Sequence, residues 1–209
     1  MYRSIVLEGV ERLHLIDGEG TLHHGADQEW YPLSWQRRAG CGPTTASQLL
    51  LYNSRTYPEL GLMTVTDKDG MVALMEEVWT YITPGLMGVH LVSHFTRGLE
   101  RYLAAHTIDR TVVSLAIPKE REARPFLDEV VAFITKSLQA GQPVAFLNLD
   151  SAGIRNLDPW HWVTVVGLFQ VSEGSPVMLT IYDAGESFPI EFSLWYETTG
   201  RSSGFVTLA

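Results

Sequence analysis

The chain has 209 residues, of which 45% are hydrophobic and 19% are charged, proportions typical of a folded globular protein and not of a disordered one. The formal net charge is −9 and no run of Lys and Arg stands out, so we do not expect nucleic acid as a partner. This length suits one hydrophobic core, and we expect a single domain over residues 1–209.

The cysteine content and the N-terminus bear on the compartment. A lone cysteine, Cys41, excludes a disulfide within the chain and fits a reducing compartment. The N-terminus lacks the basic segment and long apolar run of a signal peptide, and no apolar run is long enough to span a bilayer. We therefore expect a soluble, cytoplasmic protein without a membrane partner, and the oligomeric state stays open.

The pattern of residues 1–142 predicts a short extension followed by helices. In residues 1–30, SIVLEGV and RLHLID are expected as short strands and DGEG as a turn; whether this extension packs on the domain, covers a cleft or mediates dimerisation stays open. Residues 35–142 are expected to be mainly helical. Apolar spacing predicts helices from Cys41 to before Pro58, over about 69–82, from a Ser93 N-cap to 105, and from Pro125 to Gly141, with a strand at 111–117.

The last third of the chain, residues 143–209, has the texture of strands. Turn residues separate five β-rich segments, which are PVAFLNL, HWVTVVGLF, VMLTIYDAG, FPIEF and GFVTLA. Helices that precede strands along the chain predict the α+β class, with an antiparallel sheet.

Cys41 is the first candidate for chemistry. A thiolate is the reactive form of cysteine, and the free N–H groups and dipole at a helix start favour it. Gly42 allows a tight turn and the close approach of a substrate, and Arg37 and Arg38 add positive potential unless both are simply solvated. Without a base nearby, however, a single cysteine is more often a small buried hydrophobe.

His161 is the histidine whose surroundings place it best as that base. It opens the segment HWVTVVGLF, so it lies at the mouth of a strand, directly after a polar loop. A catalytic histidine needs an acceptor that orients its ring. If the next turn centres on Glu173, Asp183 lies diagonal to His161 on the same face of the sheet; Asp158, in the preceding loop, is the alternative.

A fourth residue type is needed to stabilise the oxyanion of a tetrahedral intermediate. Gln36 lies five residues before Cys41, and its amide could act together with the Cys41 backbone N–H. Gln28, thirteen residues before Cys41, is the poorer substitute. His90 and His94 lack the acidic or cysteine neighbours that a metal site needs, so we expect neither a metal nor a cofactor.

Together, Gln36, CGPTTASQLLLY, HWVTVVGLF and YDAG resemble the papain-like cysteine peptidases, nearest the branch of double-glycine leader (bacteriocin-processing) peptidases and their stand-alone relatives. The specific motifs cover residues 36–50, 160–168 and 182–185. The family usually places the Gln six residues before the Cys, whereas the gap here is five. The resemblance implies a papain-like fold with Cys41 as nucleophile, His161 as general base and acid, Asp183 as orienter and Gln36 as oxyanion donor.

Three functions are compatible with this set of residues. The first is a cysteine peptidase that cleaves an amide bond of a peptide or protein through a thioester acyl-enzyme. The second is an acyltransferase or amidase that acts on a non-peptide substrate, because the same triad serves any acyl group. The third is a catalytically silent papain-like binding domain, for which the unusual Gln spacing argues.

Overall fold

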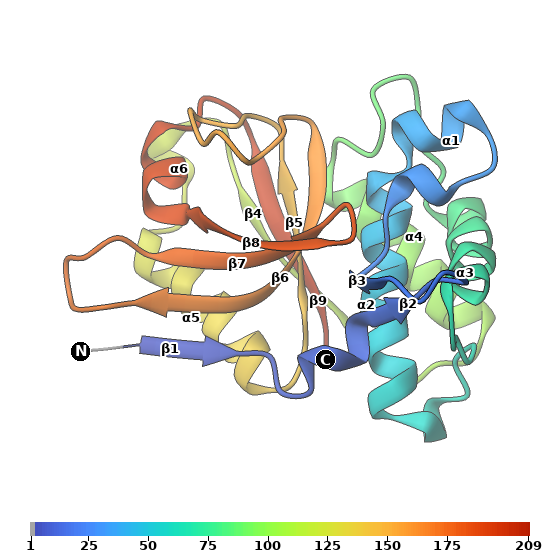
Figure 1. The fold of residues 1–209 in the computed structure, drawn as a ribbon. Coiled ribbons are helices and arrows are strands. Elements are labelled where there is room, and N and C mark those ends of the chain that lie inside the picture. Colours follow the sequence, from blue (N-terminus) through green and yellow to red (C-terminus); the bar gives the residue numbers. More distant parts are fainter. Residues whose placement is uncertain (1–2) are drawn as a thin grey trace.

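The computed structural model describes residues 3–209; residues 1 and 2 of the expected domain lie outside the described part. The described chain is of the α+β class, with helices on both faces of an antiparallel sheet (Figure 1). The prediction of the α+β class is therefore confirmed. No helix in residues 3–209 has the length and hydropathy that crossing a membrane requires.

The helices follow the predicted order with local differences. The predicted ones are α2 (Cys41–Thr56), α3 (Lys68–Tyr81), α4 (Val92–Ala105) and α5 (Leu127–Gln139). The N-cap of α4 is Leu91, without a side-chain cap bond, so the prediction of Ser93 as N-cap is wrong. Two short helices were not predicted, α1 (Ser34–Ala39) and α6 (Phe192–Thr198), because each is too short to show a helical period.

The N-terminal strands are shorter than predicted. β1 (Arg3–Val6) takes only the first part of SIVLEGV, and a 3-10 helix (Val10–Leu13) interrupts the second predicted strand. β2 (His14–Ile16) and β3 (Leu22–His24) pair as a small separate hairpin. Asp17 holds the turn between them, where its carboxylate accepts the backbone N–H groups of Glu19 and Thr21 at 3.0 and 2.8 Å.

The main sheet has the order β4-β9-β5-β6-β7-β8, and β1 pairs with the far half of β6. All neighbours are antiparallel. The remaining strand bounds are β4 (Val112–Ile117), β5 (Val144–Asn148), β6 (His161–Gln170), β7 (Met178–Asp183), β8 (Glu186–Glu191) and β9 (Ser203–Leu208). All five segments read as strands in the last third are therefore confirmed.

Two hydrophobic cores lie on opposite faces of this sheet. Along β5, Ala145 and Leu147 face the core shared with α2, α3 and α4, whereas Val144 and Phe146 face the core shared with α5 and α6. This alternation is the period of two that a strand covered on both faces requires. Figure 1 shows α1 to α4 gathered on one side of the sheet, with α5 and α6 on the other.

The start of α2 is packed tightly against the loop before α4. A Cβ added to Gly42 would lie 2.8 Å from the Cβ of Val89, so a larger residue cannot sit there unless the loop moves. The indole of Trp162, in β6, donates to the Val89 carbonyl at 2.6 Å and stacks on Phe95. Gly42 therefore fixes the helix start against β6; the expectation that it makes room for a substrate finds no support here.

Candidate active site

His161 and Asp183 form a direct hydrogen-bonded pair. The Nε2–H of His161 donates to Oδ1 of Asp183 at 2.7 Å, and both side chains are largely buried. The register explains the meeting, because Thr164 pairs with Tyr182 and Val165 with Ile181, which places Asp183 diagonal to His161 as predicted. A bulge follows between Val165 and Gly167, beyond the pair, so it does not disturb this geometry.

The backbone is strained at one residue directly next to His161 and at one directly next to Asp183. Trp160, directly before His161, has φ 60°, and Ala184, directly after Asp183, has φ 49°. Residues with a side chain rarely adopt this left-handed conformation, which costs on the order of 1–3 kcal/mol each. Both departures from regular strand geometry thus occur where the chain turns the two side chains toward each other.

Cys41 shares a small hollow with this pair. The hollow has a volume of about 150 Å³, and Cys41, His161 and Asp183 all line it. Cys41 is the first residue of α2 and is partly exposed. The N–H groups of the first turn of a helix have no partner within the helix, so the thiol lies where negative charge is stabilised. The helix start predicted at Cys41 is confirmed.

The protonation of His161 follows from these neighbours. Burial by itself lowers the pKa of the ring, but hydrogen bonds with Asp183 and Cys41, and the charges of both, raise the pKa to about 10. Nε2 is engaged by Asp183, so Nδ1 is the nitrogen left for Cys41. The raised pKa favours the protonated, cationic form of the His161 ring beside the Cys41 side chain.

The rest of the hollow is polar and acidic. Carboxylate residues Asp27, Glu29 and Asp158 line it with Asp183, and no Lys or Arg does. Gln28 and Gln48 also line it, and the amide oxygen of each is buried without a hydrogen-bond partner among the described residues. The Gln48 oxygen lies against Gly25, where an added Cβ would be 2.2 Å away.

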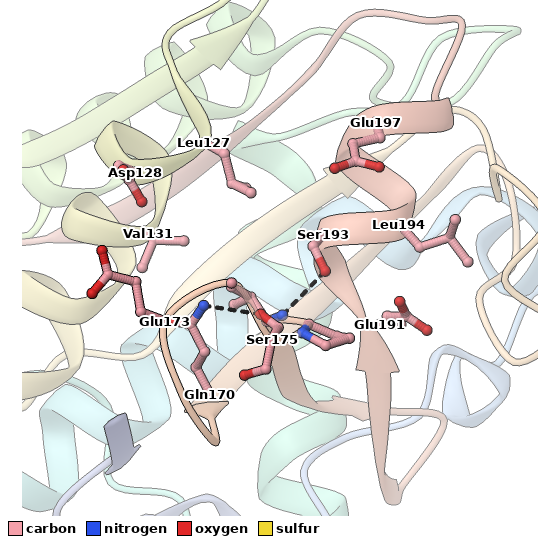
Figure 2. A pocket seen from close by; sticks show the side chains of 13 residues that line it. Leu127, Asp128, Val131, Gln170, Glu173, Ser175, Glu191, Ser193, Leu194 and Glu197 are labelled. Carbon is pink, nitrogen blue, oxygen red and sulfur yellow. Dashed lines mark hydrogen bonds between the residues drawn. The ribbon is translucent and has the colours of Figure 1, made fainter. Parts of the chain in front are cut away.

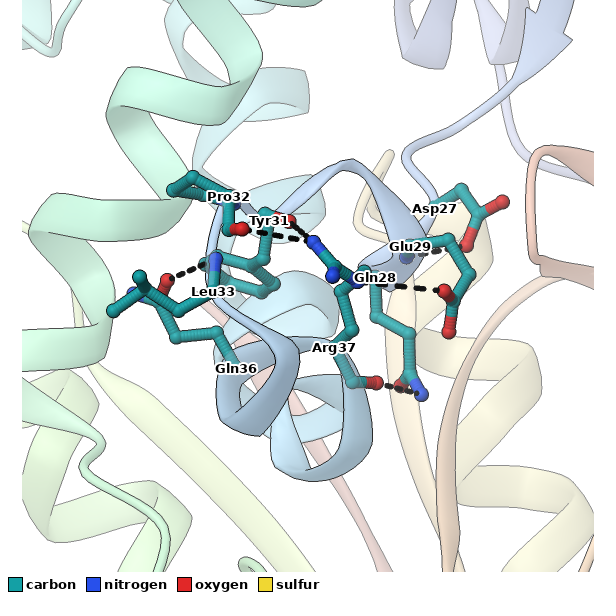
Figure 3. Close-up of polar contacts among 8 residues, drawn as sticks. All are labelled: Asp27, Gln28, Glu29, Tyr31, Pro32, Leu33, Gln36 and Arg37. Carbon is teal, nitrogen blue, oxygen red and sulfur yellow. Dashed lines mark hydrogen bonds and ion pairs between the residues drawn. The ribbon is translucent and has the colours of Figure 1, made fainter.

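The structure separates the two candidate glutamines (Figure 3). Gln36 lines neither hollow that Cys41 borders, and its amide oxygen accepts the backbone N–H of Leu33 at 3.3 Å, at the start of α1. Gln28 does line the small hollow, and its amide donates to the Arg37 carbonyl at 2.8 Å. A second N–H of the Gln28 amide remains for a ligand. Gln28 therefore lies in the small hollow whereas Gln36 does not, because α1 turns the Gln36 side chain toward Leu33.

Asp158, the alternative orienter, lines the same hollow, but His161 bonds to Asp183. The loop that carries Asp158 is held instead by Asn148, whose amide donates to the Asp158 carbonyl at 2.7 Å. Asn148 pairs with His161 across β5 and β6 and is fully buried. Asn148 therefore positions the strand mouth from which His161 projects, a role that its place in an apolar segment did not indicate.

A larger hollow lies elsewhere in the described chain. It has a volume of about 660 Å³ and lies among α5, α6 and the loop between β6 and β7 (Figure 2). Its charged residues are all acidic, namely Asp128, Glu173, Glu191 and Glu197, and it contains neither a cysteine nor a histidine. Size alone therefore does not identify the candidate site, since the small hollow is the one that both Cys41 and His161 line.

A histidine pair lies close to the turn after Asp183. His14 contacts His24 and the Tyr182 hydroxyl at 3.2 and 3.1 Å, and the backbone N–H of His24 donates to the Gly185 carbonyl. Within residues 3–209 no three His, Cys, Asp or Glu side chains are arranged to hold a metal ion. The small hairpin thus braces the β7–β8 turn, and residues 1–30 pack on the domain where they are described.

Comparison with models of protein families and with curated proteins finds no match for this chain.

Proposed function

We propose that this protein is a cysteine hydrolase of papain-like type that cleaves an amide bond, with a peptide or protein as substrate. The single observation that carries the proposal is the 2.7 Å hydrogen bond from His161 to Asp183 in a hollow that Cys41 also borders. Nucleophile, base and orienter occur here in the order and roles that acyl transfer by a thiol requires.

In the proposed reaction, Cys41 and His161 act first in forming the acyl-enzyme and then in its hydrolysis. The Cys41 thiolate attacks the acyl carbon, and the His161 imidazolium gives its proton to the leaving amine, which departs and leaves a thioester. Neutral His161 then takes a proton from water, whose oxygen attacks the thioester, and the acid is released as the thiolate and imidazolium re-form. Asp183 holds the ring and stabilises its positive charge.

We assign the oxyanion site to Gln28, together with the backbone N–H of Cys41. Gln28 lines the hollow and is anchored through Arg37, only four residues before the nucleophile. A donor fixed in this way needs no reorganisation when the oxyanion forms. Gln36, the expected donor, is turned toward Leu33 instead.

A peptide fits the walls of the hollow better than a small polar ester. Gln28 and Gln48 line the hollow, and side-chain amides can exchange hydrogen bonds with the N–H and C=O groups that every peptide unit supplies. The surrounding carboxylates would also favour the cationic amine that peptide cleavage releases. The lone cysteine fits a reducing compartment, and we propose the cytoplasm as the location.

The test is hydrolysis of a mixed library of unstructured peptides, with cleavage followed by mass spectrometry. The wild-type protein should generate new termini, whereas Cys41→Ala should generate none and remain folded by circular dichroism. Activity on small amides without any peptide cleavage would favour the amidase alternative. Equal cleavage by the Cys41→Ala variant would remove the proposal.

A further inference from the structure

A second hollow also borders Cys41, and neither His161 nor Asp183 lines it. It has a volume of about 370 Å³, and its large apolar residues are Trp35, Leu86, Met87 and Trp160; Arg38, Ala39 and Gly88 complete the lining. These four side chains are 46%, 99%, 57% and 44% exposed, respectively. Single exposed apolar residues are ordinary, but four that converge on one hollow beside a thiol form a surface suited to an apolar ligand. We call this surface the apolar groove.

One wall of the apolar groove is a tight backbone turn. Leu86 and Met87 form the tip of a tight turn that is closed by reciprocal backbone hydrogen bonds between Gly85 and Gly88, at 3.3 and 3.0 Å. Gly88 has φ 65°, which glycine adopts without strain. The turn therefore holds two large apolar side chains in solvent, next to the start of α2.

The opposite wall is fixed at an energetic cost. Trp160 adopts its left-handed backbone conformation directly before His161, and the Arg201 guanidinium lies 5.1 Å from the centre of its ring. This cation–π contact holds the indole at the rim of the groove. Strain that persists at a bulky residue beside a reactive pair is a sign of a functional constraint.

The two hollows hold different parts of the substrate. His161 lines only the small acidic hollow, and it must give its proton to the leaving amine, so the leaving group lies on that side. The acyl part then extends from the carbon at Cys41 into the apolar groove. A residue of extended chain spans at most about 3.6 Å, so the first residues of the acyl part fall within this groove.

We propose that the apolar groove binds a large apolar side chain, such as Leu or Phe, on the acyl side of the scissile peptide bond. This inference rests on the proposed function, since it takes Cys41 as the nucleophile. It departs from the double-glycine substrates that the resemblance in sequence implies, because glycine would leave the walls of the groove in water. A well-filled apolar pocket discriminates by about 10-fold or more between side chains of different size.

The experiment compares reagents that alkylate Cys41. Iodoacetamide measures the reactivity of the thiol alone, whereas dipeptidyl acyloxymethyl ketones ending in Phe, Leu or Gly, and one ending in Gly-Gly, add an acyl-side residue. Thiolate attack on these ketones displaces the carboxylate group. The rates are measured on the wild-type protein, on Leu86→Ser/Met87→Ser, and on the matched exposed control Val171→Ser.

The expected result is inactivation by the Phe and Leu ketones about 10-fold or more faster than by the glycine ketones. The double variant should lose this preference with its iodoacetamide rate unchanged, and Val171→Ser should keep it. Fast iodoacetamide labelling without a preference for Phe or Leu would overturn the groove and leave the hydrolase standing, as would a preference that survives the double substitution. Slow iodoacetamide labelling would instead count against the hydrolase itself.

Discussion

The Nε2–H of His161 donates to the Asp183 carboxylate at 2.7 Å, although 22 positions separate the two residues. One opens β6 and the other closes β7, so the antiparallel register alone brings them together. The hydrogen bond orients the His161 ring and leaves Nδ1 for Cys41.

Removing the charge of Asp183 tests the orienting role. Asp183→Asn is expected to lower kcat for peptide cleavage on the order of 10²-fold or more, because the imidazolium loses its anionic partner. The pKa of His161 should also fall, which can be followed by NMR titration of the ring protons. Asp158→Asn, the other candidate, should change kcat much less. A larger effect at Asp158 than at Asp183 would refute the assignment.

Two substitutions decide between the candidate oxyanion donors. Gln28→Glu keeps the size of the side chain but removes its N–H donors, and we expect kcat to fall about 10²–10³-fold. Gln36→Glu keeps an oxygen for the Leu33 N–H, so kcat should stay within a few-fold of the wild type. Steady-state kinetics on one peptide measures both. The reverse pattern would return the role to Gln36.

The raised pKa of His161 predicts a pH dependence of stability. The pKa of the ring is about 10 in the folded state and near the ordinary histidine value of 6.5 in the unfolded state, so the folded state holds the proton more tightly. The stabilisation is therefore fully present below pH 6.5 and is lost as the pH rises toward 10. Urea denaturation at pH 6, 8 and 10 should show the difference between wild type and His161→Gln shrinking along that series. A difference that grows with pH would contradict the assignment.

The strained alanine after Asp183 predicts a trade between stability and activity. Ala184→Gly should raise the free energy of unfolding by about 0.5–1 kcal/mol. Glycine adopts a positive φ without strain, and this gain exceeds the loss that comes from the greater entropy of the unfolded chain. The same change should lower kcat, since Asp183 is held less firmly. Ala152→Gly is the matched control, with φ 51° in a loop away from the hollow. It should stabilise the protein without altering kcat; an equal loss of activity in both variants would argue against a role for the strain.

The sequence allowed the outline of the fold to be predicted because its periods are strong. The apolar spacing after Cys41 and the β-branched run after His161 each belong to one element type, and the structure has these elements at these residues. The short helices α1 and α6 were not predicted, because six or seven residues form fewer than two helical turns. In the N-terminal hairpin, a strand within RLHLID and the DGEG turn were predicted, whereas the partner strand β3 was not, because three residues are too few to show a strand pattern.

One part of the candidate site could also be predicted from the sequence, and another part could not. The register that joins His161 to Asp183 follows from strand pairing and could be predicted, whereas the place of Gln28 could not. Spacing along the chain favoured Gln36, but α1 turns that side chain back toward Leu33. The apolar groove was not predicted either, because Leu86 and Met87 belong to a turn and come together with Trp160 only in the folded chain.

The most direct test of the central claim is the rate of iodoacetamide alkylation of Cys41 between pH 5 and 10, followed by intact mass. The account predicts rapid alkylation at pH 6 to 7 in the wild type, and a much slower reaction in His161→Gln that rises only at alkaline pH. Equal rates and equal pH profiles in the two proteins would show that His161 does not activate Cys41, and would contradict the account.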